Sequence, residues 1–300
     1  MLKTLKYNWR YIISSSNKIA TLFFSLWGFI TLVTPTDGIL NVIENWFLRI
    51  LLAALILLII YAIIIVTVTI HSKAITIKKV FNLHSNHALY VEYGDLFNCG
   101  ASDERKNIAF AGNRCFDTIV DDDLVGSNKI HGIALKRIYE NGDRNQETVN
   151  EEIQHNLSFH GYKKEFLSQK DKRKGNLTRY EVGSVAEIKG FQNEQYFILG
   201  MTYFDKELRA RVEKDDYIKA ISSLVKYISD RSQGFPVYMP VIGTGVADIG
   251  TVNELIAFII ETIRIYKDEI DCDMHIVIND KEDKLGLLNL AILYGGYIHE

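Results

Sequence analysis

The hydrophobic and polar positions of this chain follow two patterns, and the change comes near residue 72. Residues 50–70 form a run of twenty-one residues without a charged side chain. Beyond residue 72, short alternating or apolar runs take turns with segments whose apolar residues recur at helical spacing. The pattern predicts an N-terminal helical hairpin over residues 1–72 and a three-layer α/β domain over residues 73–300.

Within the α/β region, the runs that predict strands are 75–80, 88–93, 107–110, 179–188, 195–204, the segment before Gly243, and 274–278. The segments that predict helices are 131–142, 215–230, 252–266 and 285–293. Residues 143–176 are rich in charge and include KDKRKG at 170–175. We interpret them as a solvated surface excursion, with a lipid or nucleic-acid patch as the alternative.

The apolar run at 50–70 predicts a membrane span. At about 1.5 Å per residue, a helix of this length covers roughly 31 Å, which matches a hydrocarbon core. A buried core helix is the alternative, but such helices are seldom apolar around their whole circumference. A second run, 19–34, has sixteen residues, and it spans only if Lys18 snorkels or the bilayer thins. A signal peptide is disfavoured because no small-x-small cleavage site follows.

Charge predicts the orientation of this hairpin. Basic residues flank its two ends, and the connection carries only Arg49; the flanking residues are Lys3, Lys6, Arg10, Lys18, Lys73, Lys78 and Lys79. The positive-inside bias therefore places both termini and the α/β domain in the cytoplasm, with a multi-pass anchor in the membrane. The family resemblance described below implies that this is the inner membrane of a bacterial cell. Neither span contains Asp, Glu, Lys, Arg or His, which disfavours transport.

Composition excludes several further classes. A formal net charge of −3 is not the basic footprint of a general nucleic-acid binder. The three cysteines are widely spaced, so they predict neither a disulfide framework nor a zinc site. His84 and His87 form an HxxH without the further ligands that zinc needs, and we predict no metal site.

The strand before Gly243 runs directly into Gly243-Thr244-Gly245, and a helical pattern follows. Glycines without a Cβ let a diphosphate approach their amides, and a helix N-terminus adds positive potential there. The turn is neither a Walker A nor a GxGxxG motif, so a tight connection without a ligand stays possible on this evidence alone.

Five segments occur in a specific order: VEYGDLFNC, IAFAGNRCFD, LVGSNKIHGIALKRIYENG, YFILGMTYF and MPVIGTGVADIG. Together they resemble the macro domain, an ADP-ribose-binding module, from about residue 75 to the C-terminus. The resemblance implies a three-layer α/β/α fold with a mixed sheet.

The resemblance also implies roles for residues at matching positions. Asp95 would accept a hydrogen bond from the adenine amino group, and Asn113 would contact the distal ribose through its amide. Segments 126–132 and 243–247 would be the two phosphate loops. The implied binding residues are Asp95, Leu96, Asn113, Gly126, Ser127, Lys129, His131, Gly132, Gly243, Thr244, Gly245, Val246 and Ala247. The alternative for Asp95 is a turn former, and for Asn113 a strand-end cap.

Three positions depart from the family pattern. The first loop reads Gly126-Ser127-Asn128-Lys129 instead of a run of glycines. His131 stands where hydrolytic members often carry an acid, and Ala247 stands where an aromatic residue usually lies beside the distal ribose. Losing the acid disfavours de-ADP-ribosylation, so we predict no catalytic residue. The alanine would leave room for a substituent on that ribose.

A two-span hairpin joined to such a domain resembles the membrane-macro effectors of type II Thoeris anti-phage defence. The resemblance implies that a partner TIR-domain enzyme converts NAD into an ADP-ribose conjugate of the histidine-linked type. The macro domain would bind this conjugate without a cofactor, form homo-oligomers and disrupt the lipid bilayer. The alternatives are a membrane-tethered ADP-ribose hydrolase and a passive anchor that recruits ADP-ribosylated partners.

Overall fold

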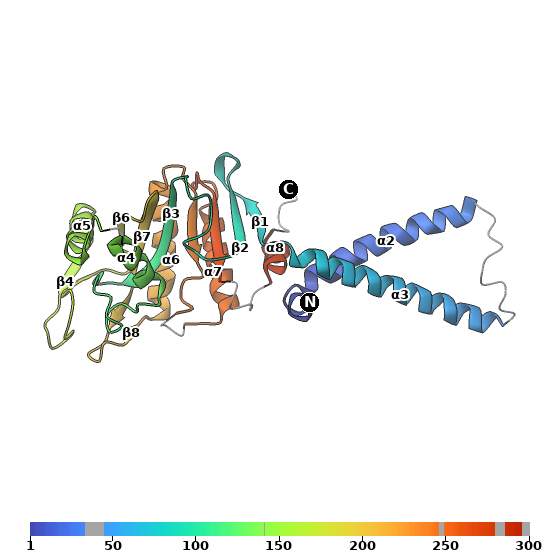
Figure 1. Ribbon diagram of the computed structural model, residues 1–300, viewed down its shortest axis with the longest axis horizontal. Coiled ribbons are helices and arrows are strands. Elements are labelled where there is room, and N and C mark those ends of the chain that lie inside the picture. Colours follow the sequence, from blue (N-terminus) through green and yellow to red (C-terminus); the bar gives the residue numbers. More distant parts are fainter. Residues whose placement is uncertain (34–44, 141, 246–248, 280–285, 296–300) are drawn as a thin grey trace. The chain divides into compact units, whose positions relative to one another are not determined.

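The computed structural model describes residues 1–33, 45–140, 142–245, 249–279 and 286–295 (Figure 1). The chain divides into two compact units, one made of residues 1–78 and 286–296 and the other of residues 79–285 and 297–300. The helices of the first unit are α1 (Leu2–Tyr7), α2 (Trp9–Val33), α3 (Trp46–Lys73) and α8 (Leu287–Gly295).

Helix α3 contains the predicted span at 50–70. Among the described residues it is the helix that is long and apolar enough to cross a membrane, with a mean hydropathy of 3.2 in its most apolar window. The hydroxyls of Thr67, Thr69 and Ser72 donate to carbonyls four residues earlier, so these polar groups are satisfied within the helix. The second predicted span lies in α2, apart from Thr34, which is outside the described residues. That second span and the orientation of the hairpin stay predictions.

The C-terminal helix α8 docks on the junction of α1 and α2. The Asn8 side chain accepts a hydrogen bond from Leu288 N at 3.0 Å. In return, Asn289 accepts from Tyr11 N at 2.9 Å and donates to the Tyr7 carbonyl at 2.6 Å. The two asparagines therefore satisfy backbone groups at the helix ends, where the helices leave such groups unpaired. The last predicted helix thus groups with the N-terminal helices and not with the sheet.

The second unit is built on a mixed sheet whose order, in the described part of the chain, is β1-β2-β10-β9-β3-β7-β6, with β8 paired to β7. Strands β2, β10, β9, β3 and β7 run parallel, and β6 and β8 run antiparallel to β7. The strands are β1 (Ile77–Asn82), β2 (Ala88–Tyr93), β3 (Lys106–Asn113), β6 (Val185–Lys189), β7 (Glu194–Phe204), β8 (Ala210–Arg211), β9 (Val237–Pro240) and β10 (Met274–Ile278). β4 (Lys164–Phe166) and β5 (Thr178–Tyr180) form a separate antiparallel pair.

Helices cover both faces of the sheet. Helices α4 (Ile130–Glu140) and α5 (Gln146–Phe159) share a buried core with Phe110 of β3 and Ile198 of β7. On the other face, Tyr227 of α6 (Lys214–Arg231) packs edge-on against Phe197, with ring centroids 5.4 Å apart. Helix α7 (Val252–Ile265) contacts α6 through Phe258 and Tyr217, whose ring centroids are 5.7 Å apart. The sequence prediction of a three-layer α/β/α domain with a mixed sheet is therefore confirmed.

The prediction for residues 143–176 was wrong, because this segment contains helix α5 and buried contacts. Asn145 and Thr148 form a reciprocal capping box at the start of α5, and the helix buries Val149, Ile153 and Leu157. The KDKRKG run is mostly an exposed loop, as predicted, but Lys172 within it is almost fully buried against Asp117. The segment 179–188 is likewise two strands, β5 and β6, separated at Gly183, which has a φ of +86°.

Candidate ligand-binding site

A cavity of about 570 Å³ lies where β3, β7 and β9 reach their carboxyl ends. In parallel sheets, this edge is where loops from neighbouring strands meet and where ligands bind. Several of the predicted binding residues line this cavity; they are Asn113, Gly126, Lys129, His131, Gly243, Thr244 and Gly245. The topology therefore brings both predicted loops to one site.

Asn113 ends β3 at a bulge that pairs it with Thr202 of β7. Its buried side chain accepts hydrogen bonds from Cys115 N at 3.0 Å and from Asp117 N at 3.4 Å. The oxygen thus performs the strand-end capping that we considered as the alternative role. The amide nitrogen makes no such bond to the described residues, so it is the part of the side chain that a ligand could use.

Glycine at position 132 shapes the first loop. A Cβ there would lie 2.2 Å from the Gly126 carbonyl oxygen, so only glycine lets the loop rest on the first turn of α4. The Ser127 N–H is used within the loop, because it donates to Asp122 at 2.6 Å. This hydrogen bond is the main cause that lowers the pKa of Asp122. Ser127 and Gly132 therefore maintain the loop and do not line the cavity, in contrast to Gly126 and Lys129.

His131 is the buried polar residue of this wall. It lies in the first turn of α4, tilted against Phe110 with ring centroids 5.8 Å apart. Its Nε2 has no hydrogen-bond partner among the described residues. Burial lowers the pKa of His131 to about 4, so the imidazole is neutral at physiological pH.

This shift predicts a pH dependence of stability. The unfolded state binds a proton near pH 6.5 and the folded state only near pH 4, so stability is intact above pH 6.5 and falls as the pH drops. We expect a loss of about 2 kcal/mol between pH 7.5 and pH 5 from this group. Pulse proteolysis in urea of the full chain in detergent would measure it, and His131→Gln should flatten the curve. An unchanged pH slope in the variant would contradict the assignment to His131.

The second loop is held from behind by α6 and α7. The Tyr217 hydroxyl donates to the Ile242 carbonyl at 3.0 Å. Gly243 has a φ of +102°, which a residue with a side chain adopts at a cost, and an added Cβ would lie 3.0 Å from the Tyr217 ring and 3.3 Å from Leu255. The Thr244 hydroxyl donates to the Val241 carbonyl at 3.1 Å, and Gly245 has open space where a Cβ would be. The predicted residues Val246 and Ala247 lie outside the described residues.

Asp95 and Leu96 do not line the cavity. The exposed Asp95 carboxylate accepts hydrogen bonds from Phe97 N at 3.0 Å and from the Asn98 side chain at 3.2 Å. This is the turn-forming role that we gave as its alternative. Leu96 is buried in the core beside Phe97. Contact of either residue with adenine stays a prediction.

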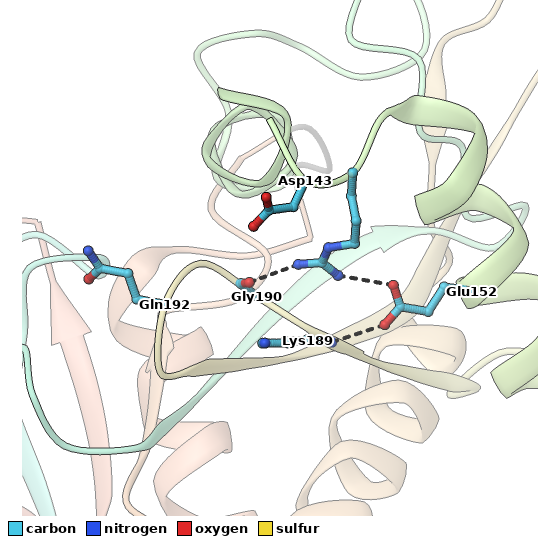
Figure 2. Close-up of a pocket in the computed structure, with 6 residues that line it drawn as sticks. Asp143, Glu152, Lys189, Gly190 and Gln192 are labelled. Atoms are coloured by element: carbon cyan, nitrogen blue, oxygen red, sulfur yellow. Dashed lines mark hydrogen bonds and ion pairs between the residues drawn. The ribbon is translucent and has the colours of Figure 1, made fainter. Parts of the chain in front are cut away.

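A second, smaller hollow of about 330 Å³ lies between the start of α5 and the β6–β7 turn (Figure 2). Arg144 donates to Glu152 at 3.0 Å and to the Gly190 carbonyl at 2.9 Å. Lys189 N donates to the same carboxylate at 3.3 Å. Dashed lines in Figure 2 join the Glu152 carboxylate to the backbone of Lys189 and mark the bond to the Gly190 carbonyl. Their pairing, and the absence of every predicted binding residue from its lining, leave the larger cavity as the candidate site.

Comparison with known proteins identifies the domain. The family model "Thoeris protein ThsA, Macro domain" matches residues 89–279, which is more than half of the chain. This chain belongs to the Thoeris ThsA macro-domain family. It is 27% identical over 184 residues to the Thoeris protein ThsA of Bacillus amyloliquefaciens (strain Y2). That similarity covers 59% of this chain and only 57% of the relative.

Solved macrodomains are similar in fold. The Oceanobacillus iheyensis macrodomain with ADP has a TM-score of 0.45 and 14% identity, covering 73% of this chain and 96% of that one. The same macrodomain with MES bound has a TM-score of 0.44 and 13% identity, covering 73% and 97%.

This macro domain has site residues that the sequence interpretation missed. Phe204, Leu208, Arg209 and Arg211 line the cavity from a hairpin formed by β7 and β8. Asp122 and Asp123 line it from the turn that precedes the first loop. Two features of the sequence could have indicated these residues: the three aspartates at 121–123, before the first loop, and the alternating charges after residue 204. Neither feature belongs to the motifs that carry the resemblance to macro domains.

Proposed function

We propose that this protein is a membrane effector of anti-phage defence, whose macro domain binds an NAD-derived ADP-ribose conjugate. The conjugate is of the histidine-linked type, and a partner TIR-domain enzyme makes it. One observation carries the proposal. In a chain of the ThsA macro-domain family, Asn113 lines one cavity together with Gly126 and Lys129 of the first loop and Gly243, Thr244 and Gly245 of the second loop. The same cavity is large enough for a nucleotide-sized ligand.

The two loops supply the chemistry for a diphosphate. The N-terminus of α4 adds a positive end of the helix dipole, and Lys129 adds a full charge on the cavity wall. On the second loop, the backbone at Gly245 has no described side chain within 4 Å of where its Cβ would be, so a phosphate can approach it. The Asn113 amide nitrogen then donates to a ribose hydroxyl, while its oxygen keeps the turn in place.

Binding without turnover is the form of this function that the described residues favour. A general base works best with a pKa near the operating pH. The pKa of His131 is lowered to about 4, and that of Asp122 is lowered by the Ser127 N–H. Neither group is tuned for water activation near neutral pH. We therefore propose a binding protein and treat a hydrolase as the outcome that a turnover assay would reveal.

The membrane part of the proposal is a population shift. Helix α3 has the length and composition of a span, and we propose that it forms an inner-membrane hairpin with α2, both termini cytoplasmic. Conjugate binding favours a homo-oligomeric state, and clustering concentrates the hairpins until the bilayer is disrupted. A shift from about 1% to 99% in the assembled state needs about 5.5 kcal/mol of differential binding.

Dye release from liposomes containing the full-length protein tests this function. The histidine conjugate of ADP-ribose should trigger oligomers and leakage, whereas ADP-ribose hydrolysis should not be detectable. Asn113→Asp should abolish the response, because the carboxylate keeps the acceptor for Cys115 N but loses the amide donor and repels a diphosphate. A saturating conjugate that causes neither assembly nor leakage would overturn the effector proposal. Function retained after exchange of the hairpin for an unrelated anchor would favour a passive tether.

A further inference from the structure

The hairpin between β7 and β8 brings two arginines to the cavity wall close to Asn113. In the β7–β8 ladder Arg211 is opposite Tyr203, and in the neighbouring ladder Asn113 is opposite Thr202. With strands about 4.8 Å apart, the Arg211 Cα lies roughly 10 Å from the Asn113 Cα. An arginine side chain covers most of that distance, so its guanidinium reaches a group attached to the sugar that Asn113 contacts.

The Asp205 carboxylate accepts hydrogen bonds from the Nε–H groups of both arginines. Its Oδ2 accepts from Arg209 Nε at 3.0 Å and from Arg211 Nε at 3.1 Å, and its Oδ1 accepts from the backbone N–H of Glu207 and Arg209. Desolvation opposes ionisation of this carboxyl, but these hydrogen bonds prevail and lower its pKa to about 2. The support is therefore charged at any physiological pH.

The two arginines differ in the hydrogen-bond donors that remain for a ligand. Arg209 also donates through Nη2 to Glu207 at 3.0 Å. Arg211 has Asp205 as its one ion-pair partner in the described part of the chain, and its side chain is half exposed. A guanidinium fixed at Nε presents its two Nη groups as a planar fork, which matches a carboxylate in bidentate fashion.

The surroundings of Arg211 fit a small group with a single negative charge. Leu208 is buried at the hairpin tip and lines the cavity together with Phe204, which gives the group an apolar floor. Arg211 itself contributes a single positive charge, which a singly charged group matches. A carboxylate therefore suits the site better than a doubly charged phosphate.

We propose that Arg211 is the residue that selects the ligand, by binding a carboxylate carried on the distal-ribose end of the ADP-ribose conjugate. This inference rests on the proposed function, because it requires that ADP-ribose occupies the cavity with its distal ribose at Asn113. Arg209 and Asp205 position Arg211 and do not themselves decide the selection.

Isothermal titration of the full-length protein in detergent micelles tests the selection. The probes are ADP-ribose, its histidine conjugate, the same conjugate with a carboxamide in place of the carboxylate, and ADP-ribose phosphorylated on the distal ribose. We expect the carboxylate conjugate to bind about tenfold more tightly than the carboxamide, as for one charge-assisted bidentate contact. In Arg211→Gln this difference should vanish, while the affinity for ADP-ribose changes by less than about threefold.

Lys206→Gln is the matched control, because it removes one positive charge from the same hairpin at a residue that does not line the cavity. It should keep the full discrimination. Arg211→Lys keeps the positive charge but lacks the planar guanidinium, so it should keep only part of the discrimination between the carboxylate and the carboxamide conjugate. If both Arg211 variants lose ADP-ribose itself, Arg211 supports the cavity and the selection is wrong.

The remaining outcomes are also decisive. Discrimination that survives in Arg211→Gln, or an equal gain from the phosphorylated probe, would overturn a carboxylate contact at Arg211. Failure of the wild-type protein to bind any of the four nucleotides would instead overturn the proposed function. The two ideas therefore fail in different titrations.

Discussion

A Gly132→Ala variant is expected to lose about 2–3 kcal/mol of stability, as for an overpacked core site, and about a hundredfold in affinity for the conjugate. The new methyl group would lie 2.2 Å from the Gly126 carbonyl oxygen, and the obstacle is backbone, which cannot rotate away. The first loop must therefore lift from α4, and Gly126 and Lys129 leave their places on the cavity wall. Pulse proteolysis in urea would measure stability, and titration with the conjugate would measure affinity.

Gly245→Ala is the matched control for that experiment. Among the described residues no atom lies within 4 Å of its new Cβ, and the φ of Gly245 is not in the left-handed region, so stability should be unchanged. The methyl group would nevertheless occupy the space through which a phosphate approaches the backbone, and affinity should fall. A Gly132→Ala protein with wild-type stability and affinity would show that the loop does not depend on close contact with α4.

The pattern of apolar residues was sufficient for most elements of the α/β domain. Strand β10 was predicted with its observed bounds, 274–278, and α7 within one residue. Both bury side chains whose spacing is visible in the local sequence, such as Ile256, Ile259, Ile260 and Ile263 in α7. Helix α5 was missed although Val149, Ile153 and Leu157 recur every four residues, because the surrounding charges dominated the interpretation.

The features of the site that could not be predicted from the sequence depend on contacts between residues far apart along the chain. Burial of His131 follows from its contact with Phe110, which comes from another strand, and its lowered pKa follows from that burial. The placement of Arg211 beside Asn113 needs two strand registers at once. By contrast, the convergence of both loops was predictable, since parallel strands end at the same edge of a sheet.

The buried ion pair between Lys172 and Asp117 was also invisible in the sequence, because its partners are 55 residues apart. Lys172 Nζ donates to both carboxylate oxygens, at 2.8 and 2.7 Å, and to the Asn176 carbonyl at 2.8 Å. The ammonium also lies 5.7 Å from the ring centroid of Phe204, which lines the ligand cavity. The ion pair thus holds the segment after α5, which contains Lys172, against the loop after β3, which contains Asp117.

All three tryptophans, Trp9, Trp27 and Trp46, lie in the N-terminal unit, so tryptophan fluorescence would not report on this pair. Pulse proteolysis in urea, with bands assigned by mass spectrometry, follows the macro domain instead. A short pulse of protease digests the molecules that are unfolded at each urea concentration, because folded molecules do not unfold within the pulse.

Lys172→Met is expected to destabilise the macro domain by about 3–5 kcal/mol, because it leaves the Asp117 carboxylate buried without its counter-charge. Burial already raises the pKa of Asp117 with the lysine present, and removal of the lysine would raise it further. Lys172→Met combined with Asp117→Leu should recover much of the loss, since an apolar pair needs no charge compensation. Lys174→Met, in the same basic run but exposed, should behave like the wild type. Equal stability of the Lys172 and Lys174 variants would mean that the ion pair does not hold the segment in place.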